Sequence, residues 1–468
     1  MTPDTVAPRI SDSPSPSLLK GLGPLDGAAI IVSNVVGSGI FIVPVFVAQA
    51  VPNAAAMLGV WLAGGVLAFA GAMAYAELAA LRPKAGGEYV YLREAFGPVA
   101  GFLTGWTSFV AGFSGAIAAS AVGLATYLGR FLPAAGDTTP FLRIPLGLLT
   151  LSVTPQAVVA LTAIGVLTAV HVVGIGPGRL VQNVLAGLKV LVLVTLVSLG
   201  FAFGHGATAN FSQSAGPVTA SAWMLALIPV MFSYSGWNAA AYVAEEMRDP
   251  SRNVPLAMGI GTVAVVAIYL LLNLLYVYAL PVSALATVEV RVIDAAADQL
   301  FGPAVARPLA AASAVMIAAS VSAMVLAGPR VYYAMAQDGQ FFSAMARVHP
   351  TYRTPTTAIV AQSVWSGVLV LTGTFEQLVE YTGFAVVLFA GIAVTVVFVL
   401  RRRDPDAERP YKTWGYPVAP LVFVVASFMM VTNAIWRSPG TSFAGLTIIA
   451  AGVPIYFLVW RQSTVQDS

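Results

Sequence analysis

The sequence contains no cysteine and only three histidines among its 468 residues. Without cysteine the chain can form no disulfide, no thiolate metal site and no cysteine nucleophile, so it cannot pair with a disulfide-linked subunit. His171, His205 and His349 are scattered over the chain. We therefore expect no metal centre and no other cofactor.

Charge is scarce as well. Only 9% of the residues are charged, whereas soluble domains carry about 25%. The net charge of +3 is too small to indicate binding to nucleic acid. Since 58% of the residues are hydrophobic and the mean hydropathy is +0.84, the composition predicts a polytopic protein of the lipid bilayer. Residues 1–24, rich in Ser and Pro, lack the features of a signal peptide and predict a disordered cytoplasmic arm.

Apolar runs long enough to cross a bilayer recur along the chain and predict an all-α fold with about twelve transmembrane helices. The predicted spans, uncertain by several residues at each end, lie at about 25–50, 54–81, 96–130, 154–176, 180–204, 221–246, 254–281, 303–336, 356–375, 378–400, 415–437 and 441–460. The third and eighth spans are too long for one upright helix, so they must tilt or protrude.

The distribution of Lys and Arg predicts the orientation. An N-terminus in the cytoplasm places about 17 of the 23 basic residues inside and about five outside. Both termini are therefore predicted to be cytoplasmic, with residues 462–468 as a C-terminal tail, and we expect the protein in the cytoplasmic membrane.

Two predicted spans contain small residues at matching positions. Span one contains Gly37-Ser38-Gly39, and span six contains the segment from Phe232 to Asn238. Glycine and serine in mid-span weaken a helix, and interrupted helices at corresponding positions are typical of transporters built from inverted repeats. Residues 25–204 and 221–400 would be the two repeats, followed by two further helices in 401–461. The alternative is that the small residues only let helices pack closely.

Such breaks suit one class of ligand. The free amide groups at the start of a half-helix favour a carboxylate, and free carbonyls favour an ammonium group. A site that offers both is suited to an α-amino acid.

Lys189 lies inside the apolar run 185–194, with no carboxylate nearby in the sequence. A bare ammonium in hydrocarbon is costly, so such a residue usually faces the protein interior or an ion or substrate path. The alternative is a lysine whose ammonium reaches the membrane surface, which would require a position nearer the end of the span.

Several segments together resemble the amino acid permeases of the amino acid–polyamine–organocation superfamily, and its L-type branch most of all. Besides the two glycine-containing breaks they are Tyr75-Ala-Glu-Leu78, Arg82-Pro-Lys-Ala-Gly-Gly-Glu-Tyr-Val-Tyr91, Ala95-Phe-Gly-Pro98, Glu245-Glu-Met247, Arg252-Asn-Val-Pro255, Tyr381-Thr-Gly-Phe384 and Arg409-Pro-Tyr-Lys412. The resemblance implies the LeuT-type fold, with two five-helix inverted repeats, broken helices one and six, and two extra C-terminal helices.

The resemblance also implies roles for single residues. The substrate carboxylate would bind at Gly37, Ser38 and Gly39, and the substrate ammonium at the carbonyls of Val35, Phe232 and Ser235. Phe232 would close over the substrate as a gate. Sodium-coupled relatives bind Na⁺ between spans one and eight, and Lys189 would take its place, holding the first helix through carbonyls near Val32 and Val35. Ser320 and Ser322 would be further partners of Lys189.

The sequence departs from the family in the pocket. Ser235 stands where relatives often have glycine, and residues 384–388 of span ten are apolar where relatives often have a polar residue. No Asp or Glu lies in the middle of spans one, three or eight, which favours neutral substrates.

The expected function is secondary transport of neutral L-amino acids by alternating access, independent of sodium, as an exchanger or a uniporter. A proton-coupled symporter and an antiporter for cationic amino acids or polyamines remain alternatives. An enzyme is not expected, because no convergent catalytic groups and no phosphate-binding loop are present in the sequence.

Overall fold

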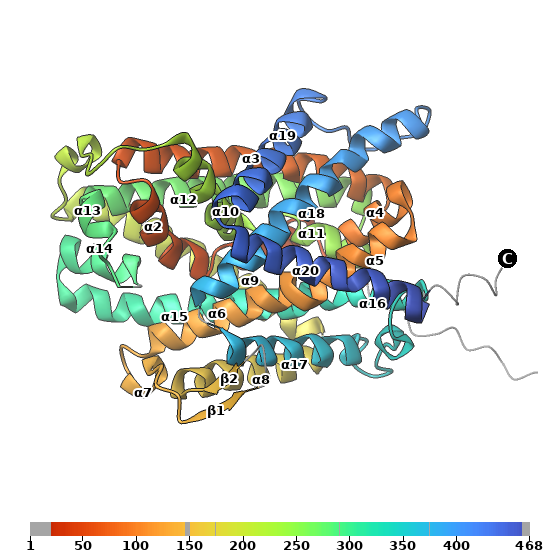
Figure 1. Cartoon of the computed structure of the whole chain (residues 1–468), viewed down its shortest axis with the longest axis horizontal. Coiled ribbons are helices and arrows are strands. Elements are labelled where there is room, and N and C mark those ends of the chain that lie inside the picture. The colour runs from red at the N-terminus through yellow and green to blue at the C-terminus, as the bar shows by residue number, and fades with distance from the viewer. Residues whose placement is uncertain (1–19, 146–149, 174, 290, 374, 461–468) are drawn as a thin grey trace, which may run out of the picture.

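A computed structural model describes residues 20–145, 150–173, 175–289, 291–373 and 375–460, which form helices and one two-stranded sheet (Figure 1). The first part of the chain forms α1 (Pro24–Val35), α2 (Ser38–Ala50), α3 (Ala54–Leu81), α4 (Glu88–Phe96), α5 (Pro98–Thr107), the π-helical turn η1 (Ser108–Gly112), α6 (Phe113–Leu128), α7 (Pro133–Gly136), β1 (Leu142–Pro145), β2 (Thr150–Val153), α8 (Pro155–Val172), α9 (Ile175–Phe203) and η2 (Thr208–Ser212).

The second part begins with the other interrupted helix. It forms α10 (Ala220–Tyr234), α11 (Ala239–Tyr242), η3 (Ala244–Glu246), α12 (Pro250–Ala279), α13 (Val282–Leu285), α14 (Val292–Phe301), α15 (Pro303–Ala327), α16 (Pro329–Gln337), η4 (Ser343–Ala346), α17 (Thr356–Thr372), α18 (Phe375–Arg403), α19 (Val418–Arg437), α20 (Pro439–Ile455) and η5 (Tyr456–Trp460). Most of the predicted arm (1–19) and the tail lie outside the described residues.

Nine helical segments in the described ranges are long and apolar enough to cross a membrane. The pair α1 and α2, bent by 43°, makes a tenth if it is taken as one broken span. The apolar helices α10 and α17 are shorter, with 15 and 17 residues. The chain is therefore a polytopic α-helical membrane protein, while the number of twelve spans, the two inverted repeats and the terminal orientation stay predictions.

The two longest predicted spans both contain an irregularity. The segment Pro98–Leu128 is one apolar stretch, interrupted by the π-helical turn at Ser108–Gly112. The segment Pro303–Gln337 changes from α15 to α16 at Pro329, which has no amide hydrogen to donate.

A short hairpin departs from the all-α prediction. Strands β1 and β2 pair antiparallel, with Leu142 opposite Val153 and Pro145 opposite Thr150. They lie in the connection between α6 and α8, which the sequence interpretation left without structure. β-Branched residues such as Ile144 and Val153 favour strands over helices in a segment too short to cross the membrane.

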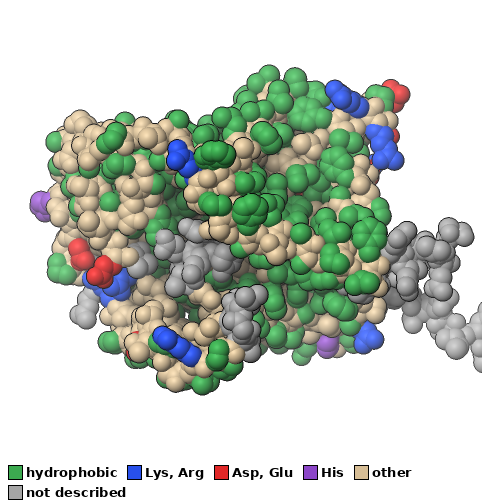
Figure 2. All heavy atoms as spheres, in the orientation of Figure 1, with side chains coloured by type: hydrophobic (Ala, Val, Ile, Leu, Met, Phe, Trp, Pro, Cys, Tyr) green, Lys and Arg blue, Asp and Glu red, His purple; other side chains and the backbone are tan. Residues whose placement is uncertain are grey.

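The helices divide into a central and a peripheral group. In the α15–α16 segment 72% of the most apolar window is buried inside the protein, compared with 22% for α8 and 28% for α19. In Figure 1, α8 and α17 run along the lower edge and α19 rises at the upper edge. Hydrophobic side chains cover much of the right half of the face in Figure 2, over α5, α18 and α20, and charged side chains lie toward the margins. This surface is suited to contact with lipid.

Candidate functional site

The first helix break lies where the sequence predicts it. α1 ends at Val35 and α2 begins at Ser38, so Val36 and Gly37 connect two helices whose axes differ by 43°. A Cβ atom on Gly37 would lie 2.6 Å from the Ser320 hydroxyl oxygen. Glycine is therefore required for the close approach of α15 to the break.

The second break follows α10. Helix α10 ends at Tyr234 and α11 begins at Ala239, with Gly236 at φ +104° between them. Residues other than glycine rarely adopt this backbone conformation. A Cβ atom on Gly236 would also lie 3.0 Å from Asn34 Cβ, so the second break packs directly against the end of α1.

Tyr269 of α12 joins the two breaks. Its hydroxyl lies 2.7 Å from the Val35 carbonyl oxygen and 3.0 Å from that of Ser233, which belong to α1 and α10. Gly39 lies against the same part of α10, because a Cβ atom there would be 2.8 Å from Ser233 Cα. The sequence interpretation did not identify Tyr269, since tyrosine in an apolar span is usually assigned to the membrane interface.

Lys189 of α9 is fully buried and lies between α1 and α15. Its ammonium donates to the carbonyls of Ser33 (3.0 Å) and Val36 (2.5 Å) and to the Ser320 hydroxyl (2.9 Å). Ser320 in turn donates to the Val36 carbonyl at 2.7 Å. All three ammonium hydrogens have an acceptor, which is what a buried lysine without a carboxylate partner requires.

The carbonyls that accept from Lys189, those of Ser33 and Val36, belong to the residues directly after Val32 and Val35. The predicted Val32 carbonyl accepts the amide of Val36 at 2.9 Å, as the last helical hydrogen bond of α1. The Val35 carbonyl accepts from Tyr269. The hydroxyl of Ser322, the other proposed partner of Lys189, lies 2.7 Å from His171 Nε2.

The residues predicted to bind the substrate carboxylate lie at the start of α2. The side chain of Ser38 is buried and its hydroxyl lies 3.1 Å from that of Ser120 on α6. Helix α2 starts at Ser38, so the first amides of α2, including those of Ser38 and Gly39, have no intrahelical acceptor. Gly37 and Gly39 pack against α15 and α10.

The predicted acceptors of the substrate ammonium are partly engaged. The Phe232 carbonyl accepts the Ser235 amide at 2.9 Å and the Ser235 hydroxyl at 2.6 Å. Serine at this position, where relatives often have glycine, therefore adds a hydrogen bond to a carbonyl that the substrate would need. The side chain of Phe232 is buried, and its Cβ atom lies next to Gly383 of α18.

A cavity lies beside the second break, with contributions from both broken helices. Ser235, Gly236, Trp237 and Asn238 form one side, and Asn34 of α1 joins them. Further lining residues come from α5, η1, α6, α15 and α18, and they are Thr104, Thr107, Ser108, Gly112, Phe113, Ala116, Met324, Ala385, Val386, Phe389 and Ala390. Ser235 is the one predicted substrate residue in this lining, and Gly37, Ser38 and Gly39 are not part of it.

Glu88, the first residue of α4, also reaches this cavity and was missed by the sequence interpretation. Its carboxylate accepts the Tyr242 hydroxyl at 2.7 Å and the Asn238 amide at 3.0 Å. Burial raises the pKa of the Glu88 carboxyl above its ordinary value. The sequence feature that marks this position is the pair of adjacent glycines, Gly86 and Gly87, directly before Glu88. Glycine allows a close approach here, since a Cβ atom on Gly87 would lie 2.5 Å from the Tyr242 ring.

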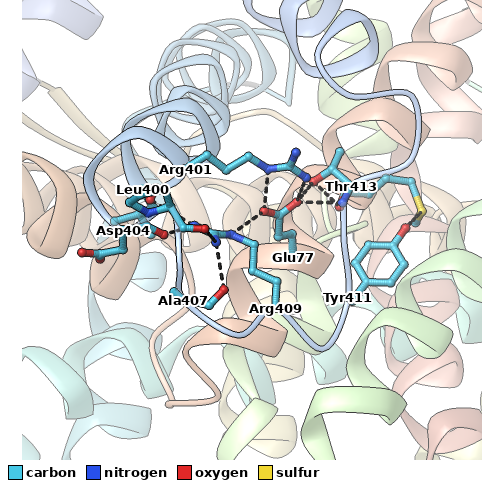
Figure 3. A network of polar contacts seen from close by, with 10 residues as sticks. Glu77, Leu400, Arg401, Asp404, Ala407, Arg409, Tyr411 and Thr413 are labelled. Atoms are coloured by element: carbon cyan, nitrogen blue, oxygen red, sulfur yellow. Dashed lines mark hydrogen bonds and ion pairs between the residues drawn. The ribbon is translucent and has the colours of Figure 1, made fainter.

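Buried ion pairs lie at the ends of helices predicted to be cytoplasmic. Glu77 of α3 accepts two hydrogen bonds from Arg401, at 2.9 and 2.7 Å, while Arg409 lies 3.4 Å away and Thr413 donates both its amide and its hydroxyl (Figure 3). Arg330 of α16 pairs with Glu246 at 2.9 Å.

The sequence is similar to a known family of membrane transporters and to several of its members. The amino acid permease family matches residues 22–460. The human b(0,+)-type amino acid transporter 1 is 30% identical, over 94% of this chain and 88% of the relative. The serine/threonine exchanger SteT of Bacillus subtilis (strain 168) is 29% identical, over 94% of this chain and 97% of the relative. The human large neutral amino acids transporter small subunit 2 is 29% identical, over 94% and 81%.

The family match and these relatives cover almost the whole chain, including both breaks, and the relatives are transporters of amino acids rather than enzymes. The chain therefore belongs to the amino acid permeases of the amino acid–polyamine–organocation superfamily, among its L-type relatives.

Proposed function

We propose that this chain carries neutral L-amino acids across the cytoplasmic membrane by alternating access, without sodium, as an exchanger or a uniporter. The substrate carboxylate binds the amides around Gly37, Ser38 and Gly39. The substrate ammonium binds carbonyls at Val35, Phe232 and Ser235, and Phe232 acts as the gate. The chain works without a disulfide-linked subunit, because it has no cysteine.

The observation that carries the sodium independence is the contact set of Lys189. Two carbonyls and one hydroxyl, from α1, from the break that follows it and from α15, all accept from its ammonium. Oxygen atoms of this kind are the usual ligands of hard metal cations. A permanent ammonium among them supplies the positive charge that Na⁺ would otherwise bring.

Support for neutral substrates comes from the cavity. Most of its lining is apolar or uncharged, and Glu88 is its one carboxylate among the described residues. The Glu88 carboxylate already accepts two hydrogen bonds. The names of two relatives, a serine/threonine exchanger and a large neutral amino acids transporter subunit, agree with this choice.

A cationic substrate is the second candidate, and Glu88 is the observation that favours it. A carboxylate in the cavity could attract the charged side chain of a basic amino acid or of a polyamine. Proton symport is the corresponding alternative for coupling, since Glu88 is a half-buried titratable group that hydrogen-bonds to Asn238 at the second break.

The test is uptake of labelled amino acids into proteoliposomes, with and without internal amino acid, in sodium or choline buffer. We expect uptake that internal neutral amino acid accelerates, that is unchanged in choline, and that moves no net protons. A requirement for sodium would remove Lys189 from its proposed role. A stoichiometric proton current with a neutral substrate would identify a symporter, and stronger competition by lysine or ornithine than by neutral amino acids would identify a cationic substrate.

A further inference from the structure

The wall of the cavity contains a π-helical turn. α5 passes into α6 through η1 (Ser108–Gly112), and residues before, within and after this turn line the cavity. Single π-helical turns inside α-helices are rare and are found frequently at functional sites. The extra residue shifts the helix face, so that Thr107 and Phe113 both face the same space.

Two buried polar groups in this lining have no hydrogen-bond partner among the described residues. They are the Thr107 hydroxyl and the amide nitrogen of the Asn34 side chain. Thr107 is 2% exposed and Asn34 is 7% exposed, and both line the cavity. Buried polar groups are almost always paired, so each unpaired group needs an explanation.

Thr104, one turn before Thr107, shows the ordinary arrangement. Its hydroxyl also belongs to the lining but donates to the carbonyl of Ala100 at 2.8 Å, within its own helix. The Thr107 hydroxyl has no such bond, although a carbonyl four residues earlier is the usual acceptor for threonine in a helix.

We infer that Asn34 and Thr107 form a subsite for the side chain of the substrate, and that this subsite selects amino acids bearing a hydroxyl or a carboxamide group. This inference rests on the proposed transport function and adds the class of substrate to it. Asn34 lies next to Val35, whose carbonyl is proposed to meet the substrate ammonium. We place the substrate side chain in this cavity because Ser235, the other proposed ammonium site next to the second break, also lines it.

The chemistry of the two groups matches such a substrate. The Asn34 amide nitrogen donates, and the Thr107 hydroxyl can donate and accept. A hydroxyl or carboxamide on the substrate satisfies both, while an apolar side chain of the same shape leaves both unpaired. Sites built to hydrogen-bond a substrate group reject the analogue that lacks it far more strongly than apolar pockets distinguish methylene groups.

The test uses isosteric pairs of competitors against labelled substrate in proteoliposomes. Threonine and valine differ by a hydroxyl in place of a methyl group, and asparagine and leucine have a similar branched shape. We expect threonine to compete at least about tenfold better than valine in the unmodified protein, and asparagine better than leucine. In the Thr107→Val variant, threonine and valine should compete about equally well. In the Asn34→Leu variant, asparagine and leucine should compete about equally well.

Two variants serve as controls. Thr104→Val removes a hydroxyl from the same cavity that is already paired within its helix, so the threonine-to-valine ratio should stay as in the unmodified protein. Thr107→Ser keeps the hydroxyl and should also keep the ratio. If Thr107→Val does not fold, Asn34→Leu decides the question.

The same experiment tells a failure of the proposed subsite from a failure of the proposed transport function. Uptake in which valine competes as well as threonine overturns the subsite and leaves the transport proposal intact. A ratio that Thr107→Val and Asn34→Leu do not change also overturns it. Absence of uptake for every amino acid overturns the proposed function itself.

Discussion

Lys189 reaches from α9 into the space that the first break leaves beside α15. Its hydrogen bonds to Ser33 and Val36 hold the last turn of α1 and the residue after it. The sequence predicted Lys189 and Ser320 because an ammonium in an apolar span must have oxygen partners inside the protein. It could not predict which carbonyls accept, since the residue at which a helix ends is uncertain by several positions.

At this scale we expect Lys189→Met to reduce the initial uptake rate by at least about tenfold. Methionine fills similar space without the charge and leaves two carbonyls and the Ser320 hydroxyl with fewer partners, at a cost of about 1–3 kcal/mol for each buried group left unpaired. The measurement is uptake normalised to folded protein from size-exclusion chromatography. Ser320→Ala removes one of the three acceptors and should have a smaller effect. Uptake at the normal rate in Lys189→Met would show that the first helix does not depend on this ammonium.

At the scale of elements, hydrogen bonds and ion pairs of Glu77 on α3 hold the end of α18 and the segment between α18 and α19. The carboxylate lies 2% exposed, and Arg401, Arg409 and Thr413 surround it (Figure 3). Arg82, the basic residue nearest to Glu77 in the sequence, pairs instead with Glu94 at 2.6 Å. Long-range partners such as Arg401 are set by how helices pack, which local spacing does not indicate.

We expect Glu77→Gln to lower the free energy of unfolding by about 3 kcal/mol, because two arginines lose the charge of a buried partner. Thermal unfolding in detergent should show a melting temperature several degrees lower. The matched control is Glu94→Gln, whose pair with Arg82 is partly exposed at 27% and 34%. That pair should contribute less than about 1 kcal/mol. Equal shifts for the two variants would contradict an anchoring role for Glu77.

At the scale of the whole molecule, the breaks, the apolar spans and the family could be predicted from the sequence, because glycine placement and hydropathy are local signals. The β1–β2 hairpin, the contact of Tyr269 with both breaks and the entry of Glu88 into the cavity could not. Each depends on elements far apart in the sequence meeting in space. Glu88 in particular comes from the short helix α4, and not from one of the apolar spans.

The proposed alternating access requires the predicted outer side to open and close, and we expect the surroundings of Asp294 of α14 to change with it. Asp294 is buried, with Arg130 at 3.3 Å and Arg291 at 3.9 Å. Burial raises the pKa of Asp294 from 3.8 to about 6, and the two arginines only partly oppose this. We take the described arrangement, in which Asp294 is buried, as the one closed on this side, and it binds the proton of Asp294 more tightly than an open one in which this carboxyl meets water.

The sign of the pH effect follows from this difference. As the pH falls through about 6, the closed arrangement gains the proton first and is favoured. When the pH falls from 7.5 to 5.5, the ratio of closed to open protein should rise about fourfold, given pKa values of about 6 in the closed and 3.8 in the open arrangement.

Because the chain has no cysteine, a single Ile228→Cys in the cavity beside α2 and α10 can report opening through its labelling by a membrane-impermeant thiol reagent. Labelling at Ala207→Cys, an exposed position, corrects for the effect of pH on the thiol. Asp294→Asn should abolish the pH dependence, and faster corrected labelling at pH 5.5 in the unmodified background would reverse the sign assigned to Asp294.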